Sequence, residues 1–174
     1  MTDNDVDHST NLADWQNHHI EGFARAAIEQ GKDGYFNAPL FSHIEGNLWV
    51  GGCKDGVRLP EDFEFVVSLY QWEKYDLPEN AVRFEVEMYD SAFVDEANVA
   101  AMADTVNTCL DKGKTLVHCQ AGLNRSNLVA AYALMQRGTT AREAIDLLRS
   151  KRSPMVLCNQ QFEQWLLEHD RVDK

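Results

Sequence analysis

The stretch that decides the fold is residues 115–126, Thr-Leu-Val-His-Cys-Gln-Ala-Gly-Leu-Asn-Arg-Ser. Its first three residues, 115–117, form a short apolar run that is typical of a buried strand. Residues 127–137 then show the apolar spacing of a helix, which Gly138 ends. The sequence therefore predicts a loop that joins the end of a strand to the start of a helix.

Such a junction is suited to anion binding, because N–H groups at a helix N-terminus lack intrahelical acceptors and the helix dipole favours negative charge. Gly122 lets the backbone curl so that successive N–H groups converge on one point. Arg125 can hold two phosphate oxygens with its planar guanidinium. Cys119 lies under the same donors, where a thiol ionises readily, so we expect a thiolate that attacks phosphorus. The alternative is a buried, inert thiol, but a core cysteine does not need Gly122, Arg125 and Ser126 around it.

The loop resembles the His-Cys-x-x-Gly-x-x-Arg-Ser signature of the cysteine-dependent protein tyrosine phosphatase superfamily, in particular its small dual-specificity phosphatase branch. The five fixed positions of the signature are occupied by His118, Cys119, Gly122, Arg125 and Ser126. The resemblance implies two-step hydrolysis of a phosphomonoester, in which Cys119 forms a phosphocysteine intermediate. It also implies that the phosphate is bound by the loop residues Gln120, Ala121, Gly122, Leu123, Asn124 and Arg125.

The resemblance assigns supporting roles to further residues. Ser126 would donate a hydrogen bond to the sulfur as the phosphocysteine breaks down, and it could also cap the helix. His118 would orient the loop, and Asn159, a predicted N-cap, would steady it. Arg152 matches by position an arginine that helps to hold substrate phosphate, although basic residues at a helix C-terminus are favourable without a ligand. A redox role for Cys158 is the alternative to a buried thiol.

A carboxylic acid must protonate the leaving oxygen of the ester. In the resembled family this acid is an aspartate on the loop after the strand that precedes the signature. Asp90 fits, since it follows the alternating strand predicted at 82–88. Asp95 is the alternative, but it is also placed to cap the helix predicted at 96–111. The remaining alternative is that both are turn residues.

These elements predict a single α/β domain with a mostly parallel central sheet flanked by helices, and an active site at the C-terminal ends of the strands. Additional strands are predicted within 44–52 and at 63–69. Additional helices are predicted at 139–152 and from Asn159 onward.

We assign residues 44–170 to the catalytic domain and residues 1–43 to an N-terminal extension. The extension contains an extra helix at 12–30, predicted from its apolar spacing, and the sequence leaves the role of this helix open. Within the domain, Trp72 and Tyr75 are expected to pack on the sheet, with a substrate-facing position as the alternative.

Composition limits the partners. The chain has 174 residues and a net charge of −12, which disfavours nucleic acid and anionic membranes at long range. It contains no apolar run long enough for a membrane span and no secretory signal, so we expect a cytoplasmic protein. The four cysteines, Cys53, Cys109, Cys119 and Cys158, show no metal-type spacing. The expected chemistry needs no metal or cofactor.

The expected substrates are phosphotyrosine and phosphoserine or phosphothreonine in a protein or peptide. One alternative is an RNA 5′-phosphatase or triphosphatase of the same superfamily, since Gly-Leu-Asn-Arg also resembles loops of that branch. The loop lacks additional basic residues, which counts against the RNA 5′-phosphatase alternative. A non-catalytic phosphate-binding module is the alternative from another class. The sequence leaves the oligomeric state open.

Overall fold

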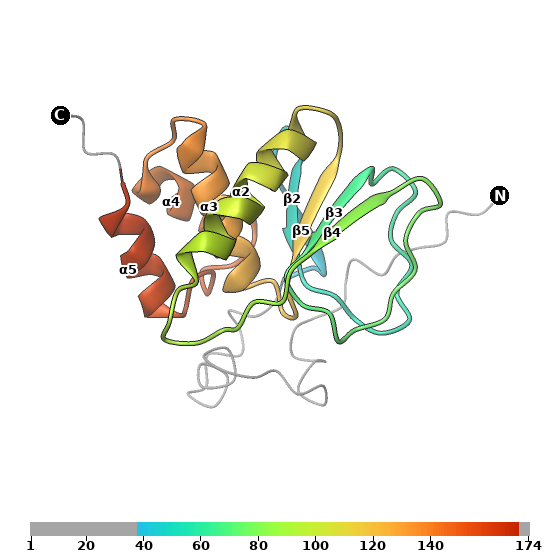
Figure 1. Cartoon of the computed structure of the whole chain (residues 1–174), viewed down its shortest axis with the longest axis horizontal. Coiled ribbons are helices and arrows are strands. Elements are labelled where there is room, and N and C mark those ends of the chain that lie inside the picture. Colours follow the sequence, from blue (N-terminus) through green and yellow to red (C-terminus); the bar gives the residue numbers. More distant parts are fainter. Residues whose placement is uncertain (1–37, 171–174) are drawn as a thin grey trace.

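A five-stranded sheet in the order β1-β2-β5-β3-β4 forms the centre of the computed structural model, which describes residues 38–170 (Figure 1). The strands are β1 (Phe41–Glu45), β2 (Leu48–Gly51), β3 (Phe65–Ser68), β4 (Val82–Glu85) and β5 (Thr115–His118). Strands β2, β5, β3 and β4 run parallel, and β1 pairs antiparallel with β2. The predicted α/β class with a mostly parallel sheet is confirmed.

Within residues 38–170, four helices lie on one side of this sheet, and the last of them packs on the two before it: α2 (Glu96–Leu110), α3 (Arg125–Gln136), α4 (Ala141–Lys151) and α5 (Gln160–Glu168). Because side chains alternate along a strand, Val67 and Val117 point into the core shared with the helices. Val66 and Leu116 point to the other face, which within residues 38–170 is covered by connecting segments that carry residues such as Phe63. No helix in this part of the chain is both long and apolar enough to cross a membrane.

The predicted helix starts agree with the structure because capping is a local interaction. The Asp95 side chain accepts a hydrogen bond from the Asn98 N–H at the start of α2. Thr140 and Glu143 form a reciprocal capping box at the start of α4. Asn159 caps α5. These caps fix where three of the four helices begin.

Other expectations were wrong or fall outside the described residues. The sequence analysis missed β1, and the strand predicted at 82–88 ends at Glu85 because its pairing with β3 ends there, at Ser68. Trp72 is 70% exposed rather than packed on the sheet. Tyr75 does pack, against the apolar cluster that contains Val66, Leu116 and Phe63 on the other face of the sheet. The helix predicted at 12–30 lies outside the described residues.

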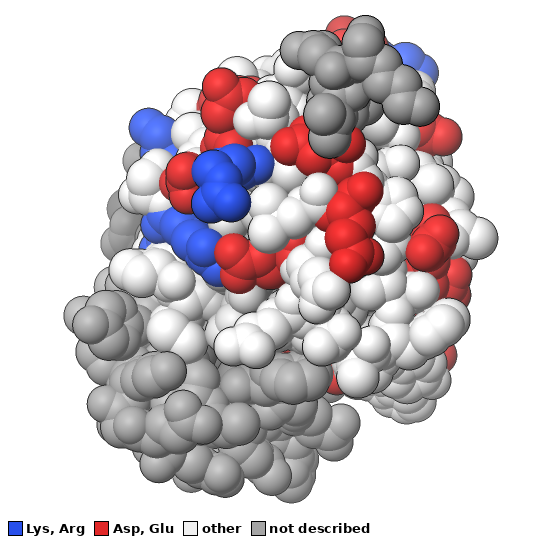
Figure 2. All heavy atoms as spheres, turned by 90° about the vertical axis from the view of Figure 1, so that its left-hand side faces the viewer, with Lys and Arg blue, Asp and Glu red and all other residues white. Residues whose placement is uncertain are grey.

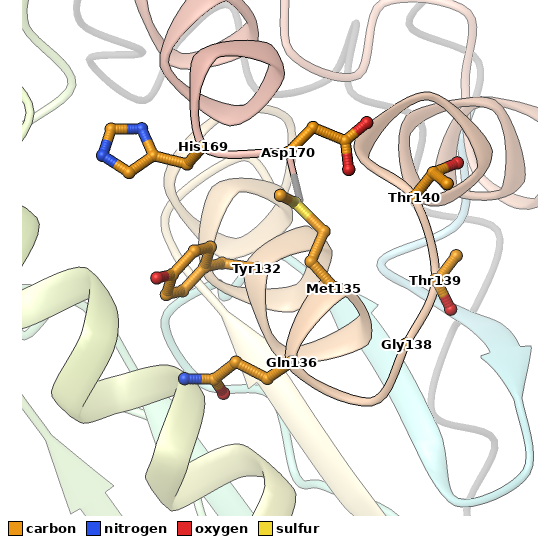
Figure 3. A pocket seen from close by; sticks show the side chains of 8 residues that line it. All are labelled: Tyr132, Met135, Gln136, Gly138, Thr139, Thr140, His169 and Asp170. Atoms are coloured by element: carbon orange, nitrogen blue, oxygen red, sulfur yellow. The ribbon is translucent and has the colours of Figure 1, made fainter. Parts of the chain in front are cut away.

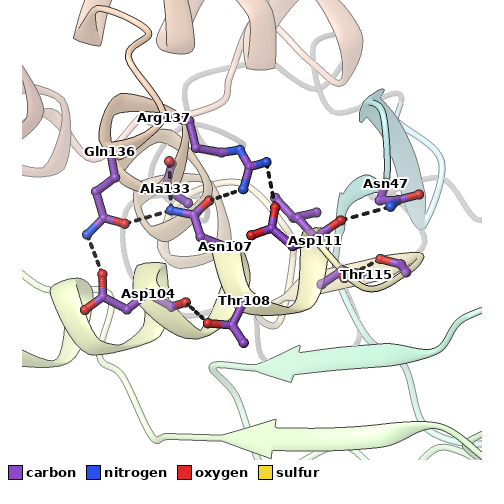
Figure 4. A network of polar contacts seen from close by, with 11 residues as sticks. Asn47, Asp104, Asn107, Thr108, Asp111, Thr115, Ala133, Gln136 and Arg137 are labelled. Carbon is purple, nitrogen blue, oxygen red and sulfur yellow. Dashed lines mark hydrogen bonds and ion pairs between the residues drawn. The ribbon is translucent and has the colours of Figure 1, made fainter.

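A polar network holds α2 against α3, the helix that begins at the signature loop (Figure 4). Asn107 donates hydrogen bonds to the Ala133 carbonyl and to the Gln136 side chain. Gln136 in turn donates to Asp104 at 2.7 Å, and Arg137 pairs with Asp111 at 2.9 Å. The network therefore joins the last turn of α3 to the second half of α2.

Candidate active site

The signature loop follows the central strand β5, at the edge of the sheet where the parallel strands have their C-terminal ends. Strand β5 ends at His118 between β2 and β3, and α3 begins at Arg125. The Cys119 N–H donates to the Gly51 carbonyl of β2 at 3.2 Å, so the pairing with β2 continues up to the cysteine. The sheet therefore fixes the first residue of the loop, and α3 fixes its end.

The Cys119 sulfur lies inside the loop, and the residue is only 2% exposed. Its Sγ accepts a hydrogen bond from the Gly122 N–H at 3.3 Å and lies 3.4 Å from Ser126 Oγ. Backbone N–H and hydroxyl groups at this distance can donate hydrogen bonds to a negatively charged sulfur. The structure thus brings together three of the predicted residues around one sulfur atom.

Gly122 has a conformation that other residues avoid. Its φ is +70°, and a Cβ at this position would lie 2.3 Å from the Gly51 carbonyl carbon. Its carbonyl oxygen accepts hydrogen bonds from Asn127 Nδ2 and Arg152 Nε. Its N–H, which belongs to the preceding peptide plane, donates to Cys119 Sγ. Glycine is therefore required for both the turn and the close approach.

Arg152 is a buried residue that holds the backbone of the loop by hydrogen bonds. It is 6% exposed and donates to the carbonyls of Ala121 and Gly122 in the loop, and to Pro39 O and Ser42 Oγ near β1. Burial lowers its pKa to about 10, so it remains a cation at neutral pH. These bonds direct the guanidinium to backbone oxygens, which gives it a structural role that does not require substrate phosphate.

Arg125 is the last residue of the loop and the first residue of α3. Its Nη1 donates to the Met88 carbonyl at 3.0 Å, and its guanidinium lies 5.1 Å from the centre of the Tyr70 ring. Its Nε is buried and has no hydrogen-bond partner within residues 38–170. A buried unpaired donor is costly, so this N–H is well placed to bind an anion in the loop.

Asp90 is linked to the signature loop by two asparagines. Its carboxylate accepts from Asn124 Nδ2 at 2.8 Å and from Asn159 Nδ2 at 2.9 Å. Burial raises the pKa of Asp90, against the opposing effect of these hydrogen bonds and of Arg125. Asp95, by contrast, is exposed and accepts from Asn98 at the start of α2. The hydrogen bonds therefore connect Asp90 to the loop and give Asp95 a capping role.

His118 is buried and uncharged. Burial lowers its pKa to about 4. Its Nδ1 lies 3.1 Å from the Cys119 carbonyl, which can only accept, so Nδ1 carries the proton. Nε2 must then accept a hydrogen bond from the Tyr75 hydroxyl. The pKa of Tyr75 is itself raised by burial, so this pair is neutral.

The sequence analysis missed two side-chain contacts that complete the site. Asn127 donates to the Gly122 carbonyl at 2.8 Å, and Tyr75 fixes the His118 ring. A buried asparagine within an otherwise apolar helix is a signal, since buried polar groups require partners. The sequence carries no comparable signal for the contact of Tyr75, which comes from a distant loop.

Two other cysteines near the loop have pKa values that burial raises, which disfavours their thiolates. Burial raises the pKa of Cys53, and it raises that of Cys158, a half-buried residue beside Asn124, to about 11. Within the described part of the chain, no group of three or more histidine, cysteine or acidic residues could hold a metal ion. A cavity of about 310 Å³ at the far end of α3 contains no residue of the signature loop (Figure 3). It is lined by Tyr132, Met135, Gln136, Gly138, Thr139, Thr140, His169 and Asp170.

The parallel sheet and the cysteine loop define the class of the cysteine-dependent protein tyrosine phosphatase superfamily. A family model described as "Dual specificity phosphatase, catalytic domain" matches residues 62–172, and the chain belongs to this family. The variola virus protein named "Dual specificity protein phosphatase H1" is 25% identical over 150 residues, which are 78% of this chain and 85% of that protein. The mouse "Protein tyrosine phosphatase domain-containing protein 1" is 33% identical over 102 residues, 52% of this chain but 14% of that longer protein.

Solved structures show the same fold. The active form of Tk-PTP covers 75% of this chain and 98% of its own, with a TM-score of 0.60 and 24% identity. A human tyrosine phosphatase-like serine/threonine/tyrosine-interacting protein covers 74% of this chain and 94% of its own, with a TM-score of 0.64 and 19% identity. At these identities the likeness supports the fold, and the chemistry has to be argued from the residues of this chain.

Proposed function

We propose that this protein hydrolyses phosphomonoesters on proteins through a phosphocysteine intermediate. The observation that carries the proposal is the environment of Cys119 Sγ, with the Gly122 N–H at 3.3 Å and Ser126 Oγ at 3.4 Å. These donors, and the position of the sulfur at the start of a loop suited to anions, support attack on phosphorus by Cys119.

In the first step, the Cys119 thiolate attacks phosphorus and the bond between phosphorus and the ester oxygen breaks. Arg125 and the loop amides bind the equatorial oxygens, where charge develops in the transition state. Asp90 transfers its proton to the leaving oxygen. A raised pKa favours this role, since a general acid must hold its proton near the operating pH.

In the second step, the Asp90 carboxylate takes a proton from water, and the water oxygen attacks the phosphocysteine. The phosphorus–sulfur bond breaks, inorganic phosphate leaves and Cys119 returns to the thiolate. Ser126 donates a hydrogen bond to the departing sulfur, which makes it a better leaving group. Arginine and backbone dipoles supply the charge stabilisation, so the proposed route uses no metal.

The proposed substrates are phosphotyrosine and phosphoserine or phosphothreonine residues. The family assignment and the relatives named as tyrosine or dual-specificity phosphatases support this choice. RNA 5′-phosphatase action is the second candidate, but the loop side chains between Cys119 and Arg125 carry no positive charge, and the chain has a net charge of −12. Polyanionic substrates favour basic surroundings.

The test is a panel of phosphotyrosine peptide, phosphoserine peptide, p-nitrophenyl phosphate and 5′-triphosphorylated RNA, measured with and without a chelator. We expect the peptides and the aryl phosphate to be hydrolysed equally well in both conditions. Cys119→Ser should abolish turnover but still bind phosphopeptide. Full activity in this variant would exclude the mechanism, faster RNA turnover would favour the second candidate, and peptide binding without turnover by the unmodified chain would identify a binding module.

A further inference from the structure

A second pocket, of about 240 Å³, lies directly beside the segment that carries Asp90. We name it the flank pocket. Its lining residues come from that segment and from α3 and α5: Glu87, Met88, Tyr89, Ser91, Phe93, Asp95, Leu128 and Phe162. None of them belongs to the signature loop, and the proposed mechanism uses none of their side chains.

The flank pocket has an apolar floor and an aromatic rim. Met88, Leu128 and Phe162 are buried and form the floor. Tyr89 and Phe93 are 70% and 75% exposed, although large aromatic side chains usually bury most of their surface. An aromatic ring that remains in water next to an apolar hollow offers a contact surface for a ligand.

Two carboxylates give the flank pocket a negative charge. Glu87 and Asp95 both line it, and each accepts hydrogen bonds from one neighbour, Tyr89 and Asn98 respectively. A carboxylate has about four acceptor sites, so both retain capacity for another donor. No lysine or arginine lines the pocket. Acidic side chains are also widespread on the side of the molecule formed by α4 and α5 (Figure 2).

The flank pocket adjoins the proposed general acid and Arg125. Tyr89 and Ser91 are the chain neighbours of Asp90, and the Met88 carbonyl is 3.0 Å from Arg125 Nη1. An extended peptide advances about 3.3 Å per residue. Residues within three positions of the phosphorylated one therefore reach about 10 Å from it, and these are the positions to test.

We propose that the flank pocket binds an arginine or lysine side chain of the phosphorylated substrate, and so selects phosphopeptides with a basic residue near the phosphate. This rests on the proposed function. The methylene stem of the basic side chain packs on Met88 and between the rings of Tyr89 and Phe93. Its cationic head meets Glu87 and Asp95. This one ligand chemistry matches the floor, the rim and the charge together.

The test is a set of phosphotyrosine peptides with an alanine-rich background, in which arginine is placed at each position from three before to three after the phosphotyrosine. Leucine and glutamate replace the arginine in matched peptides. We expect one or two positions at which arginine raises kcat/KM about tenfold over alanine, while glutamate lowers it. Glu87→Gln should remove most of this gain, and Phe93→Ala should reduce it, with hydrolysis of p-nitrophenyl phosphate changed less than about twofold.

Glu79→Gln removes an equal charge at an exposed position before β4 and should keep the arginine preference. The proposal is overturned if arginine, leucine and alanine peptides react equally at every position, if leucine fully replaces arginine, or if Glu87→Gln keeps the preference. The same peptides are also bound to Cys119→Ser and followed by fluorescence anisotropy. If p-nitrophenyl phosphate is not hydrolysed, the proposed function fails, and this binding series still decides whether the flank pocket selects a basic side chain.

Discussion

At the scale of single residues, Asp90 is a carboxyl group with opposing influences on its proton affinity. Burial raises its pKa, and the hydrogen bonds from Asn124 and Asn159 counteract part of this effect. If Asp90 protonates the leaving group, Asp90→Asn should slow hydrolysis of a phosphoserine peptide by about 100-fold. The same change should slow p-nitrophenyl phosphate by less than about tenfold, because its leaving group needs little protonation. Steady-state kcat with the two substrates is the measurement.

Asp95→Asn is the matched control for this substitution. Asparagine is as good an N-cap as aspartate, so α2 should keep its start. We expect activity within about threefold of the unmodified protein on both substrates. A larger loss in Asp95→Asn than in Asp90→Asn would transfer the role of the acid to Asp95, and equal slowing of both substrates by Asp90→Asn would remove Asp90 from it.

His118 makes stability depend on pH. Its pKa is lowered by burial from 6.5 to about 4. Between these pH values the unfolded state binds more protons than the folded state, so the free energy of unfolding rises with pH. The contribution of His118 to stability is lost as the pH falls through this window. We expect His118 to account for a loss of about 2 kcal/mol between pH 7 and pH 5. Urea unfolding at the two pH values measures it.

Other groups contribute to the same pH profile, so the decisive quantity is a difference between variants. Asp90 has a raised pKa and changes stability in the opposite direction over the acid range. His118→Asn should remove the loss assigned to His118, whereas His43→Asn, at an exposed histidine, should keep it. The explanation fails if His118→Asn shows the same decrease as the unmodified chain.

At the scale of elements, the signature loop depends on a backbone that only glycine allows at one position. A Cβ on Gly122 would meet the backbone of Gly51, and the φ of +70° adds strain. We expect Gly122→Ala to destabilise the fold by about 3 kcal/mol and to abolish turnover, because the loop must shift. Gly56→Ala provides the control, since Gly56 also has a positive φ of +77° but open space around it. It should cost only about 1 kcal/mol and keep activity.

Urea unfolding and p-nitrophenyl phosphate turnover are measured on both variants. The comparison separates the backbone strain of a positive φ from the steric clash of a Cβ with Gly51. If Gly56→Ala and Gly122→Ala lost the same stability and both remained active, the close approach to Gly51 would have no role in the loop.

The sequence predicted those elements that are formed by interactions between residues close together in the chain. The strand–loop–helix junction and the caps Asp95 and Thr140 depend on neighbours in the chain, so a short window of sequence contains the signal. Arg152 shows the opposite case. Its residue type and position suggested phosphate, but its hydrogen bonds go to carbonyls as distant as Pro39, which no local pattern specifies. The exposed Trp72 likewise depends on what the fold leaves uncovered.

At the scale of the whole molecule, the second face of the sheet has a core that begins before the domain boundary expected at residue 44. Ala38, Leu40 and Phe41 are buried in it. Strand β1 starts at Phe41, and Arg152 donates to Pro39 O and Ser42 Oγ. We therefore propose that the folded unit begins at or before Ala38, since a start at residue 44 would remove most of β1 and two partners of a buried cation.

Two shortened chains test this proposal, one starting at Ala38 and one at Ile44, both ending at Lys174. Burial of Leu40 and Phe41 is worth about 2–3 kcal/mol each, so the chain from Ile44 should be less stable by about 4 kcal/mol or more. That is a large share of the roughly 5–15 kcal/mol that stabilises a domain of ordinary size. Because Arg152 holds the signature loop, the same deletion should also lower turnover of p-nitrophenyl phosphate. Urea unfolding followed by tryptophan fluorescence gives the first quantity, and equal midpoints for the two chains would return the boundary to residue 44.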